Sequence, residues 1–147
     1  MTVRPMTIRP AIPADVPRLA DLTTQLGYPS SPEEVEARLR DLASRPEDAV
    51  LVAEEDGEAV GWIHVSALYS LEMDPCAQIQ GLVVDASRRG GGIGAALVEA
   101  ASAWAAGHGF RTLRVRSNVI RERTHAFYER LGFARTKSQV VLVRPLG

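Results

Sequence analysis

The chain has 147 residues, about the size of one typical domain with a single hydrophobic core. Its 17 Lys and Arg residues nearly balance its 18 Asp and Glu residues, which argues against the basic surface of a nucleic-acid-binding protein. No run approaches the roughly 18 apolar residues of a membrane-spanning helix. We therefore expect one globular domain over residues 1–147, with residues 1–5 as a loose tail and no membrane or nucleic-acid partner.

The cysteine content and the N-terminal residues indicate where in the cell the protein is expected. Cys76 is the single cysteine, so no internal disulfide can form, as is usual in a reducing environment. The residues before Met6 lack the apolar core of a secretory signal. The expected location is the cytoplasm.

The N-terminal third of the chain predicts a strand followed by two helices. Residues 6–12 alternate weakly between apolar and polar side chains, as in a strand. Apolar residues then recur at helical spacing, at Val16, Leu19, Leu22 and Leu26. In Ser31-Pro32-Glu33-Glu34, an N-cap Ser, a Pro at the first helical position and a Glu three residues after the cap start a second helix.

A β-hairpin and a buried strand are predicted next. Apolar runs at 49–53 and 59–65 flank Asp56-Gly57, a pair that readily adopts the positive φ angles of a tight turn. Another strand is expected from Cys76 to Val84, and its apolar end indicates burial on both faces. Gly81 in this strand suits a β-bulge.

The C-terminal part alternates helices and strands. A helix is expected from Ile93 to Gly107-His108-Gly109, followed by a strand at 113–116. A short helix that Gly132 closes and a last strand at 140–143 complete the chain. The complete order, β-α-α-β-β-β-α-β-α-β, predicts one mixed α/β domain.

The loop between the buried strand and the next helix contains four glycines in five residues, Gly90-Gly91-Gly92-Ile93-Gly94. Glycine allows positive φ angles and lets a ligand approach the backbone closely. The N–H groups at a helix start are unpaired and lie at the positive end of the helix dipole. A phosphate or pyrophosphate is the expected ligand; the alternative is a plain flexible turn.

Two common phosphate-binding motifs fit this loop poorly. A P-loop requires Gly-Lys-Ser/Thr, which Ile93-Gly94-Ala95 does not supply. A dinucleotide-binding pattern, G-x-G-x-x-A, is matched by residues 90–95, but Arg114 and Arg116 stand where an acidic residue is expected about 20 positions on. Arginine would suit a 2′-phosphate. However, only about 30 residues follow Arg116, too few to complete that fold.

Two segments together resemble the GNAT superfamily of N-acetyltransferases. Residues 89–97, Arg-Gly-Gly-Gly-Ile-Gly-Ala-Ala-Leu, resemble its acetyl-CoA motif, Gln/Arg-x-x-Gly-x-Gly/Ala. The stretch His125-Ala126-Phe127-Tyr128-Glu129-Arg130-Leu131-Gly132-Phe133 resembles its closing motif. The resemblance covers nearly the whole chain. It implies a mixed, mostly antiparallel twisted sheet of about six or seven strands with about four helices.

The resemblance also implies how acetyl-CoA is held. The pantetheine arm of the cofactor would lie where two parallel strands, ending near Val84 and Ser117, splay apart, and it would pair with backbone groups there. Backbone N–H groups of the strand that ends near Val84 could also polarise the thioester carbonyl. The cofactor-binding residues implied are Leu82, Val83, Val84, Arg89, Gly90, Gly91, Gly92, Ile93, Gly94, Ala95 and Asn118.

Tyr128 matches the family's general acid, which protonates the departing thiolate. The alternative is that Tyr128 only packs in the last helix. The interval from Asn118 to Tyr128 is about one helical turn longer than in the commonest pattern. Arg121 and Arg123 fall in this insertion, where they either reach a cofactor phosphate or lie at a solvated helix start.

The general base is less well specified. Gln80 stands where many relatives have a glutamate, and an amide cannot accept the proton. Glu72 and Asp74 lie just upstream and are the candidate bases, directly or through water; a water chain to bulk solvent is the alternative. His64 is interpreted as structural, and His108 and His125 as helix-surface residues.

Three functions compete at this point. The first is acetyl transfer from acetyl-CoA to a primary amine of a small molecule or peptide, by direct attack. The second is a non-catalytic acyl-CoA-binding or regulatory module of the same fold, and the third, disfavoured by length, is an NADP-dependent oxidoreductase. Cys76 has no activating neighbour for covalent catalysis, and the dispersed His and Cys residues predict no metal site. A homodimer is common among relatives.

Overall fold

The computed structural model describes residues 5–117 and 121–147. The chain forms two compact units, residues 1–115 and residues 116–147. Residues 1–4 of the predicted tail lie outside the described part, and the single domain over 1–147 stays a prediction.

The first unit contains a single sheet with strand order β1-β2-β3-β4-β5. Three successive pairs are antiparallel, and β4 pairs with β5 in parallel. This confirms a mixed, mostly antiparallel sheet. The strands are β1 (Met6–Pro10), β2 (Asp48–Glu55), β3 (Glu58–Leu68), β4 (Cys76–Val84) and β5 (Leu113–Val115).

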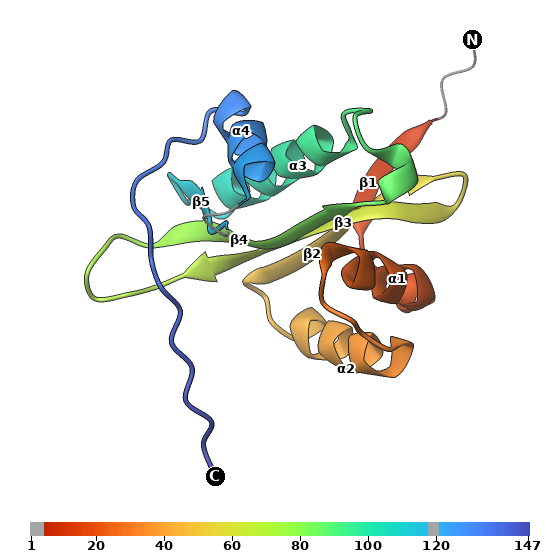
Figure 1. Cartoon of the computed structure of the whole chain (residues 1–147), viewed down its shortest axis with the longest axis horizontal. Helices are drawn as coiled ribbons and strands as arrows, with labels where there is room; N and C mark the ends of the chain where they lie inside the picture. Colours follow the sequence, from red (N-terminus) through yellow and green to blue (C-terminus); the bar gives the residue numbers. More distant parts are fainter. Residues whose placement is uncertain (1–4, 118–120) are drawn as a thin grey trace. The chain divides into compact units, whose positions relative to one another are not determined.

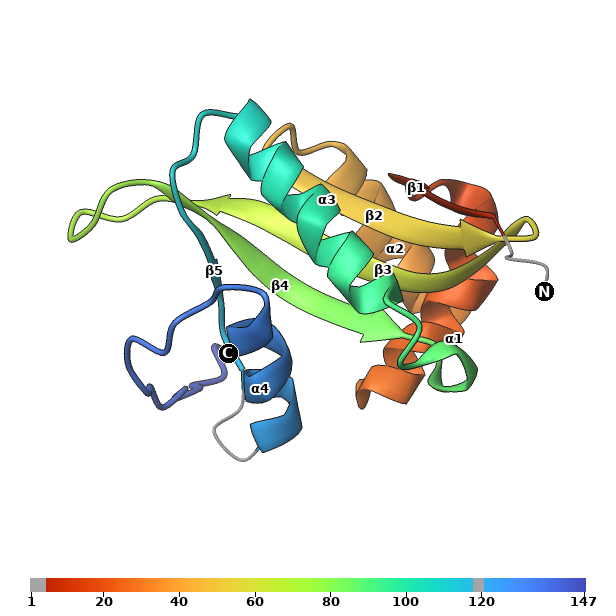
Figure 2. The same ribbon diagram turned by 90° about the horizontal axis from the view of Figure 1, so that it is seen from above.

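Helices cover both faces of this sheet. Helices α1 and α2 lie on one face and α3 lies across the other (Figures 1 and 2). The helices of the first unit are α1 (Val16–Leu26), α2 (Pro32–Ala43) and α3 (Ile93–Gly107), with short 3-10 turns η1 (Pro13–Asp15) and η2 (Ala86–Arg88). The sheet is therefore the middle layer of three.

Each sheet face has its own apolar core. On the α1/α2 face, Val52 and Trp62 pack with a cluster that includes Val16, Leu19 and Val35. On the α3 face, the sheet approaches the helix so closely that a Cβ at Gly61 would stand 3.2 Å from Leu97 Cδ1 and 2.9 Å from the Val83 oxygen. Ile63, Val65 and Leu97 are completely buried. Residues of alternating parity on β3 thus serve opposite layers.

Local chemistry explains several element boundaries. Ser31 caps α2 by accepting a hydrogen bond from the Glu34 backbone N–H, and the Glu34 carboxylate accepts one from the Ser31 N–H. Asp56 and Gly57 have φ angles of 51° and 79° in the two-residue turn between β2 and β3. The predicted helix start and the predicted hairpin are both confirmed.

An ion-pair network fixes the entry to α1. Arg9 Nη1 and Nη2 donate to the two carboxylate oxygens of Asp15, each at 2.8 Å, and Arg9 Nε donates to Glu54 at 2.8 Å. The Ile12 N–H also donates to Asp15. These hydrogen bonds, above all those from Arg9, lower the pKa of Asp15 although the carboxyl is buried.

The second unit contains α4 (Glu122–Arg130), which ends in a left-handed glycine cap. Gly132 has a φ of 95°. Its N–H donates to the Glu129 carbonyl, and the Phe133 N–H donates to the Tyr128 carbonyl. These two bonds are those of a Schellman motif, which also brings the residue after the glycine against the helix. The predicted closure of this helix by Gly132 is confirmed.

The predicted strand count is wrong. The sheet has five strands rather than about six or seven, and the expected last strand at 140–143 is absent from the described residues. Val140, Val141, Leu142 and Val143 are exposed, and no described strand pairs with them. A β-prone run becomes a strand only when another backbone satisfies its hydrogen-bonding groups.

Among the described residues, no helix has both the length and the apolar character needed to span a bilayer.

Candidate active site

The glycine loop connects the end of β4 to the start of α3. Gly90 and Gly92 have φ angles of 84° and 86°, and Gly92 is the N-cap of α3. A Cβ added at Gly90 or Gly92 would meet nothing within 4 Å. The backbone conformation therefore requires glycine at these positions, and the space beside them is open.

Backbone donors line this loop. The first backbone hydrogen bond of α3 runs from the Ala96 N–H to the Gly92 carbonyl, so the N–H groups of the first helical residues have no acceptor in the helix. Within the described residues, the N–H groups of Gly91 and Gly92 also donate no backbone hydrogen bond. These donors and the helix dipole form an arrangement that suits an anion such as a pyrophosphate.

Asp85 anchors the loop where it leaves β4. Its N–H donates to the Val60 carbonyl at 2.8 Å, and its carboxylate accepts from Arg18 Nη2 at 2.6 Å and from the Ser87 N–H at 3.1 Å. The next N–H, that of Ala86, donates to Gln25 Oε1 at 3.0 Å. The bond from Ser87, together with that from Arg18, lowers the pKa of Asp85. Helix α1 thus holds the start of the loop through two side chains.

The parallel pairing of β4 with β5 is short. Their parallel pairing covers only Ala77 to Ile79 on β4 and ends at Val115 on β5. Strand β4 continues to Val84, so residues 80–84 have no partner on that side within the first unit. An extended ligand can add to such an edge through backbone hydrogen bonds. The expected parallel pairing of β4 with β5 is present, but β5 ends at Val115 rather than near Ser117, so the splay between the two strands stays a prediction.

A β-bulge interrupts β4 just before this open edge. His64 pairs with Gly81 and Val65 pairs with Ile79, which leaves Gln80 as the extra residue. The bulge expected near Gly81 is confirmed. The bulge also determines the direction of the Gln80 side chain, whose Nε2 donates to Ser66 Oγ at 2.7 Å.

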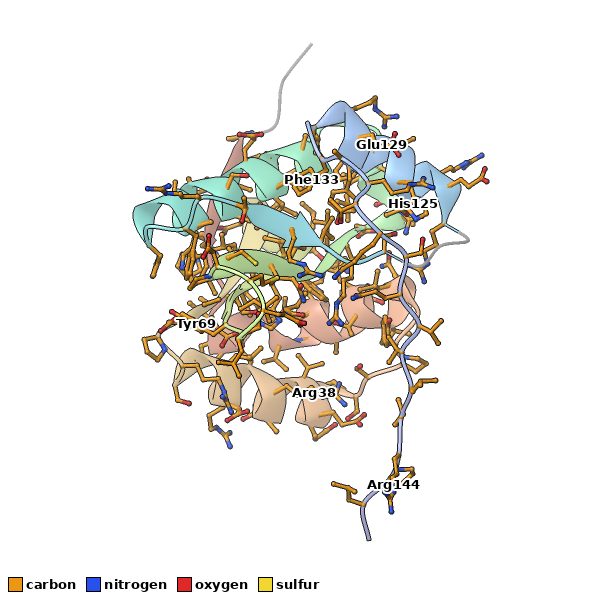
Figure 3. All side chains as sticks on the ribbon, turned by 90° about the vertical axis from the view of Figure 1, so that its left-hand side faces the viewer. Arg38, Tyr69, His125, Glu129, Phe133 and Arg144 are labelled. Atoms are coloured by element: carbon orange, nitrogen blue, oxygen red, sulfur yellow. The ribbon has the colours of Figure 1, made fainter. Side chains whose placement is uncertain are left out.

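Tyr128 is buried in the second unit. Its ring packs edge to face against Phe127 and Phe133, with centroid distances of 5.1 and 5.3 Å. Burial raises the pKa of the phenol to about 12, so the group keeps its proton at neutral pH. Figure 3 shows His125 and Glu129 along the same helix, and Arg135 lies within 3.5 Å of both.

The candidate bases Glu72 and Asp74 are both exposed in the β3–β4 connection, which Tyr69 begins (Figure 3). Neither makes an ion pair or side-chain hydrogen bond within the described residues. Asn118 lies outside the described residues. Cys76 is a buried, free thiol at the start of β4, and no three potential metal ligands gather among the described residues.

Two side-chain pairs were missed by sequence reasoning. Arg18 and Asp85 are 67 residues apart, and His64 and Asp48 are 16 apart; His64 Nε2 lies 2.8 Å from Asp48 Oδ1. No local sequence pattern predicts either pair, because both depend on how the helices and strands pack together. A signal was available only for His64, a titratable residue in the middle of a mostly apolar strand.

The Acetyltransferase (GNAT) family model matches residues 16–133 of the chain. The chain belongs to this family. Its sequence is 32% identical over 144 residues, 95% of this chain and 94% of the relative, to an aminoglycoside N(6′)-acetyltransferase type 1 of Stenotrophomonas maltophilia.

Solved structures of low sequence identity share the GNAT fold. Aminoglycoside N-acetyltransferase AAC(6′)-Iy in complex with CoA has a TM-score of 0.86 at 22% identity, covering 98% of this chain and 97% of that one. Aminoglycoside 6′-N-acetyltransferase AAC(6′)-IG from Acinetobacter haemolyticus has a TM-score of 0.83 at 21% identity, covering 96% and 99%. The GNAT chain is an N-acetyltransferase that takes its acetyl group from acetyl-CoA and transfers it to an amine.

Proposed function

We propose that this N-acetyltransferase acetylates a primary amine of an aminoglycoside or a similar polyamine. The support for this acceptor class is the relative at 32% identity, which matches over nearly the full length of both chains and is named for aminoglycoside acetylation. A peptide amine is the alternative acceptor.

The observation that carries the donor half is the junction of β4 and α3. There, among the described residues of the first unit, an unpaired strand edge runs directly into a loop whose N–H groups donate no backbone hydrogen bond. An elongated cofactor with an amide-containing arm and a pyrophosphate suits both parts at once. The backbone of Leu82, Val83 and Val84 is proposed to contact the arm, and residues Arg89 to Ala95 the pyrophosphate. Asn118 stays a proposed cofactor contact.

The chemistry needs a neutral amine, a polarised thioester and a proton for the leaving thiolate. The amine nitrogen attacks the carbonyl carbon, the C–N bond forms and the C–S bond breaks. We assign the thiolate's proton to the Tyr128 phenol, which burial keeps protonated. Glu72 and Asp74 are candidate acceptors of the amine's proton, directly or through water.

Measured release of CoA thiol, with acetyl-CoA and a panel of amines, tests the proposed acceptor class. Turnover with neamine or a related amine supports the proposal, whereas turnover of peptide amines alone overturns it.

Ligand-induced thermal shifts test the cofactor independently of turnover. Acetyl-CoA and CoA are expected to raise the unfolding temperature, and NADPH is not, because ligands that bind only the native state stabilise it by mass action. Stabilisation by NADPH alone would overturn the proposed function and favour an oxidoreductase.

A cytoplasmic location and a homodimer complete the proposal. The free thiol of Cys76 is compatible with a reducing compartment. Cell fractionation and light scattering of the purified protein test these two points separately.

A further inference from the structure

A row of polar side chains crosses the sheet on the face that α1 and α2 cover. Asp48, Ser66 and Gln78 occupy paired positions on β2, β3 and β4. His64 shares this face because side chains two residues apart on a strand point the same way. Ser66 and Gln78 are 7% and 3% exposed. Buried polar groups in an otherwise apolar face need a structural or functional reason.

Hydrogen bonds account for the part of the row nearest β4. Gln78 Nε2 donates to Gln80 Oε1 at 3.3 Å, and Gln80 Nε2 donates to Ser66 Oγ at 2.7 Å. These amides and this hydroxyl do not titrate near neutral pH, so they can orient a bound molecule but cannot accept its proton. The exposed Gln80 is the point at which solvent reaches this part of the row.

The other part of the row is a histidine–carboxylate pair. His64 Nε2 lies 2.8 Å from Asp48 Oδ1, and both side chains are 19% exposed. A carboxylate only accepts hydrogen bonds, so in the neutral ring the hydrogen is on Nε2 and the lone pair is on Nδ1. Within the described residues, Nδ1 makes no hydrogen bond. This arrangement orients an imidazole as a base.

The bulge lies on the strand next to His64. Gly81 is the β4 partner of His64, and Gln80 is the extra residue beside it. The edge of β4 proposed for the arm of the cofactor, which is unpaired within the first unit, begins at Gln80. Glu72 and Asp74, by contrast, lie in the exposed connection before β4 begins.

The electrostatic surroundings of His64 are simple. Asp48 is the only charged side chain within hydrogen-bond or ion-pair distance of it among the described residues. Its sheet neighbours, Val50 on β2 and Gln80 and Gly81 on β4, carry no charge. The apolar cluster on this face takes Val16, Leu19, Ala20, Val35 and Leu39 from α1 and α2. The charged α1 side chain that bonds to β3, Arg18, donates to the Ala59 carbonyl and pairs with Glu58 and Asp85 rather than with His64.

We propose that His64, oriented by Asp48, is the general base that deprotonates a cationic amine acceptor placed over the β4 bulge. The ammonium loses one proton to His64 Nδ1, directly or through one water. The neutral amine forms the C–N bond as the C–S bond of acetyl-CoA breaks, and the departing thiolate takes a proton from the acid of the site. The nitrogen, now bonded to the acyl group, loses its second proton to restore that acid, directly or through water. The imidazolium returns its proton to solvent. This inference rests on the proposed acetyl transfer.

The test compares wild type with His64→Gln, which keeps an amide donor for Asp48 but has no basic nitrogen. We expect kcat/KM for neamine near neutral pH to fall by about 100-fold or more. The deficit should shrink by up to about tenfold per pH unit as the free amine becomes abundant in solution. A merely structural loss would instead give a similar deficit at every pH.

Matched variants make the result specific. Asp48→Asn leaves the imidazole in place and should give a smaller loss with the same pH trend, because only orientation is impaired. His108→Gln, at the exposed end of α3, should retain wild-type activity. Affinity for CoA, measured by calorimetry, should be unchanged in all three variants, which also reports that each is folded.

The possible outcomes distinguish failure of the assigned base from failure of the proposed function. Wild-type turnover combined with full activity of His64→Gln, or with a pH-independent deficit, overturns the assignment of the base and leaves the proposed function intact. The same pH-dependent deficit in Glu72→Gln or Asp74→Asn, and not in His64→Gln, overturns it in favour of those carboxylates. Wild-type binding of CoA without turnover of any amine overturns both proposals together.

Discussion

The indole ring of Trp62 lies against the backbone of Gly81, so close that a Cβ on Gly81 would stand 2.8 Å from Trp62 Cη2 and 3.0 Å from Cζ3. Glycine at the bulge therefore leaves the space that the indole ring occupies. The contact ties the bulge to the apolar core on the α1/α2 face, to which Trp62 belongs.

Gly81→Ala should lower the free energy of unfolding by about 1–3 kcal/mol, because the added methyl group forces the indole ring to move. Urea unfolding followed by Trp fluorescence measures this. Gly107→Ala is the control, since its Cβ meets nothing within 4 Å and its φ is not positive; it should be neutral or stabilising by up to about 1 kcal/mol. An equal free energy of unfolding for Gly81→Ala and wild type would contradict this prediction, because it would show that the indole ring moves without loss of stability.

Gly92→Ala tests the proposed pyrophosphate site. Alanine at a φ of 86° should destabilise the protein by about 1–2 kcal/mol, and its methyl group would occupy the open side of the loop. We expect the Kd for CoA, measured by calorimetry, to rise by more than about tenfold. Gly109→Ala at the other end of α3 has a φ of 85° and equally open surroundings, so it should show the same strain without the loss of affinity. A similar loss of affinity in both would refute the local explanation.

Arg18→Ala tests whether α1 positions the loop. Without its bond to Asp85, the start of the loop loses one of its two α1 contacts. KM for acetyl-CoA should rise several-fold while kcat changes little, and Arg18→Lys should recover part of the effect. Arg38, an exposed residue paired with Glu34 on α2, provides the control: Arg38→Ala should leave KM unchanged. A fall in kcat at constant KM would contradict a positioning role.

Tyr128→Phe should reduce kcat by about 10-fold to 1000-fold while the Kd for CoA stays within about twofold, because only the proton donor is removed. Single-turnover thiol release and calorimetry measure the two quantities. Phe127→Leu tests whether packing beside Tyr128 alone produces such a loss; its kcat should fall far less. Equal turnover of Tyr128→Phe and wild type would remove the phenol from the mechanism.

The buried phenol also makes stability depend on alkaline pH. Below pH 10.0, the ordinary pKa, the phenol is protonated in both the folded and the unfolded chain. Between pH 10.0 and about 12 it ionises only in the unfolded chain, so folding stability decreases as the pH rises. The loss should reach about 3 kcal/mol relative to Tyr128→Phe, measured by urea unfolding across this range. A pH-independent difference between the two proteins would contradict the raised pKa.

Features set by local chemistry could be predicted from the sequence. The Asp56-Gly57 turn, the Ser31 cap and the Gly132 helix end each depend on a few adjacent residues, and all three are confirmed. The glycine loop was placed correctly between β4 and α3 for the same reason. The family resemblance added the parallel pairing of β4 with β5, which no local pattern specifies.

Features that depend on packing could not be read in this way. The strand expected at 140–143 has the residue types of a strand, but pairing requires a neighbouring backbone that the sequence pattern does not reveal. His64 was interpreted as structural because its partner, Asp48, is defined only by the register of β2 against β3. The same is true of Arg18, whose link to Asp85 depends on where α1 lies on the sheet.

The short pairing of β4 with β5 has a consequence for hydrogen–deuterium exchange. Amides of residues 80–84 that face β5 lack a protein acceptor there within the first unit, so the free enzyme should exchange them quickly, although residues 81–84 are paired with β3 along their other edge. A cofactor arm that pairs with this edge would slow their exchange by supplying the missing acceptors. The ligand would then serve as the next strand of the sheet, and part of the protein's secondary structure would be complete only when its substrate is bound.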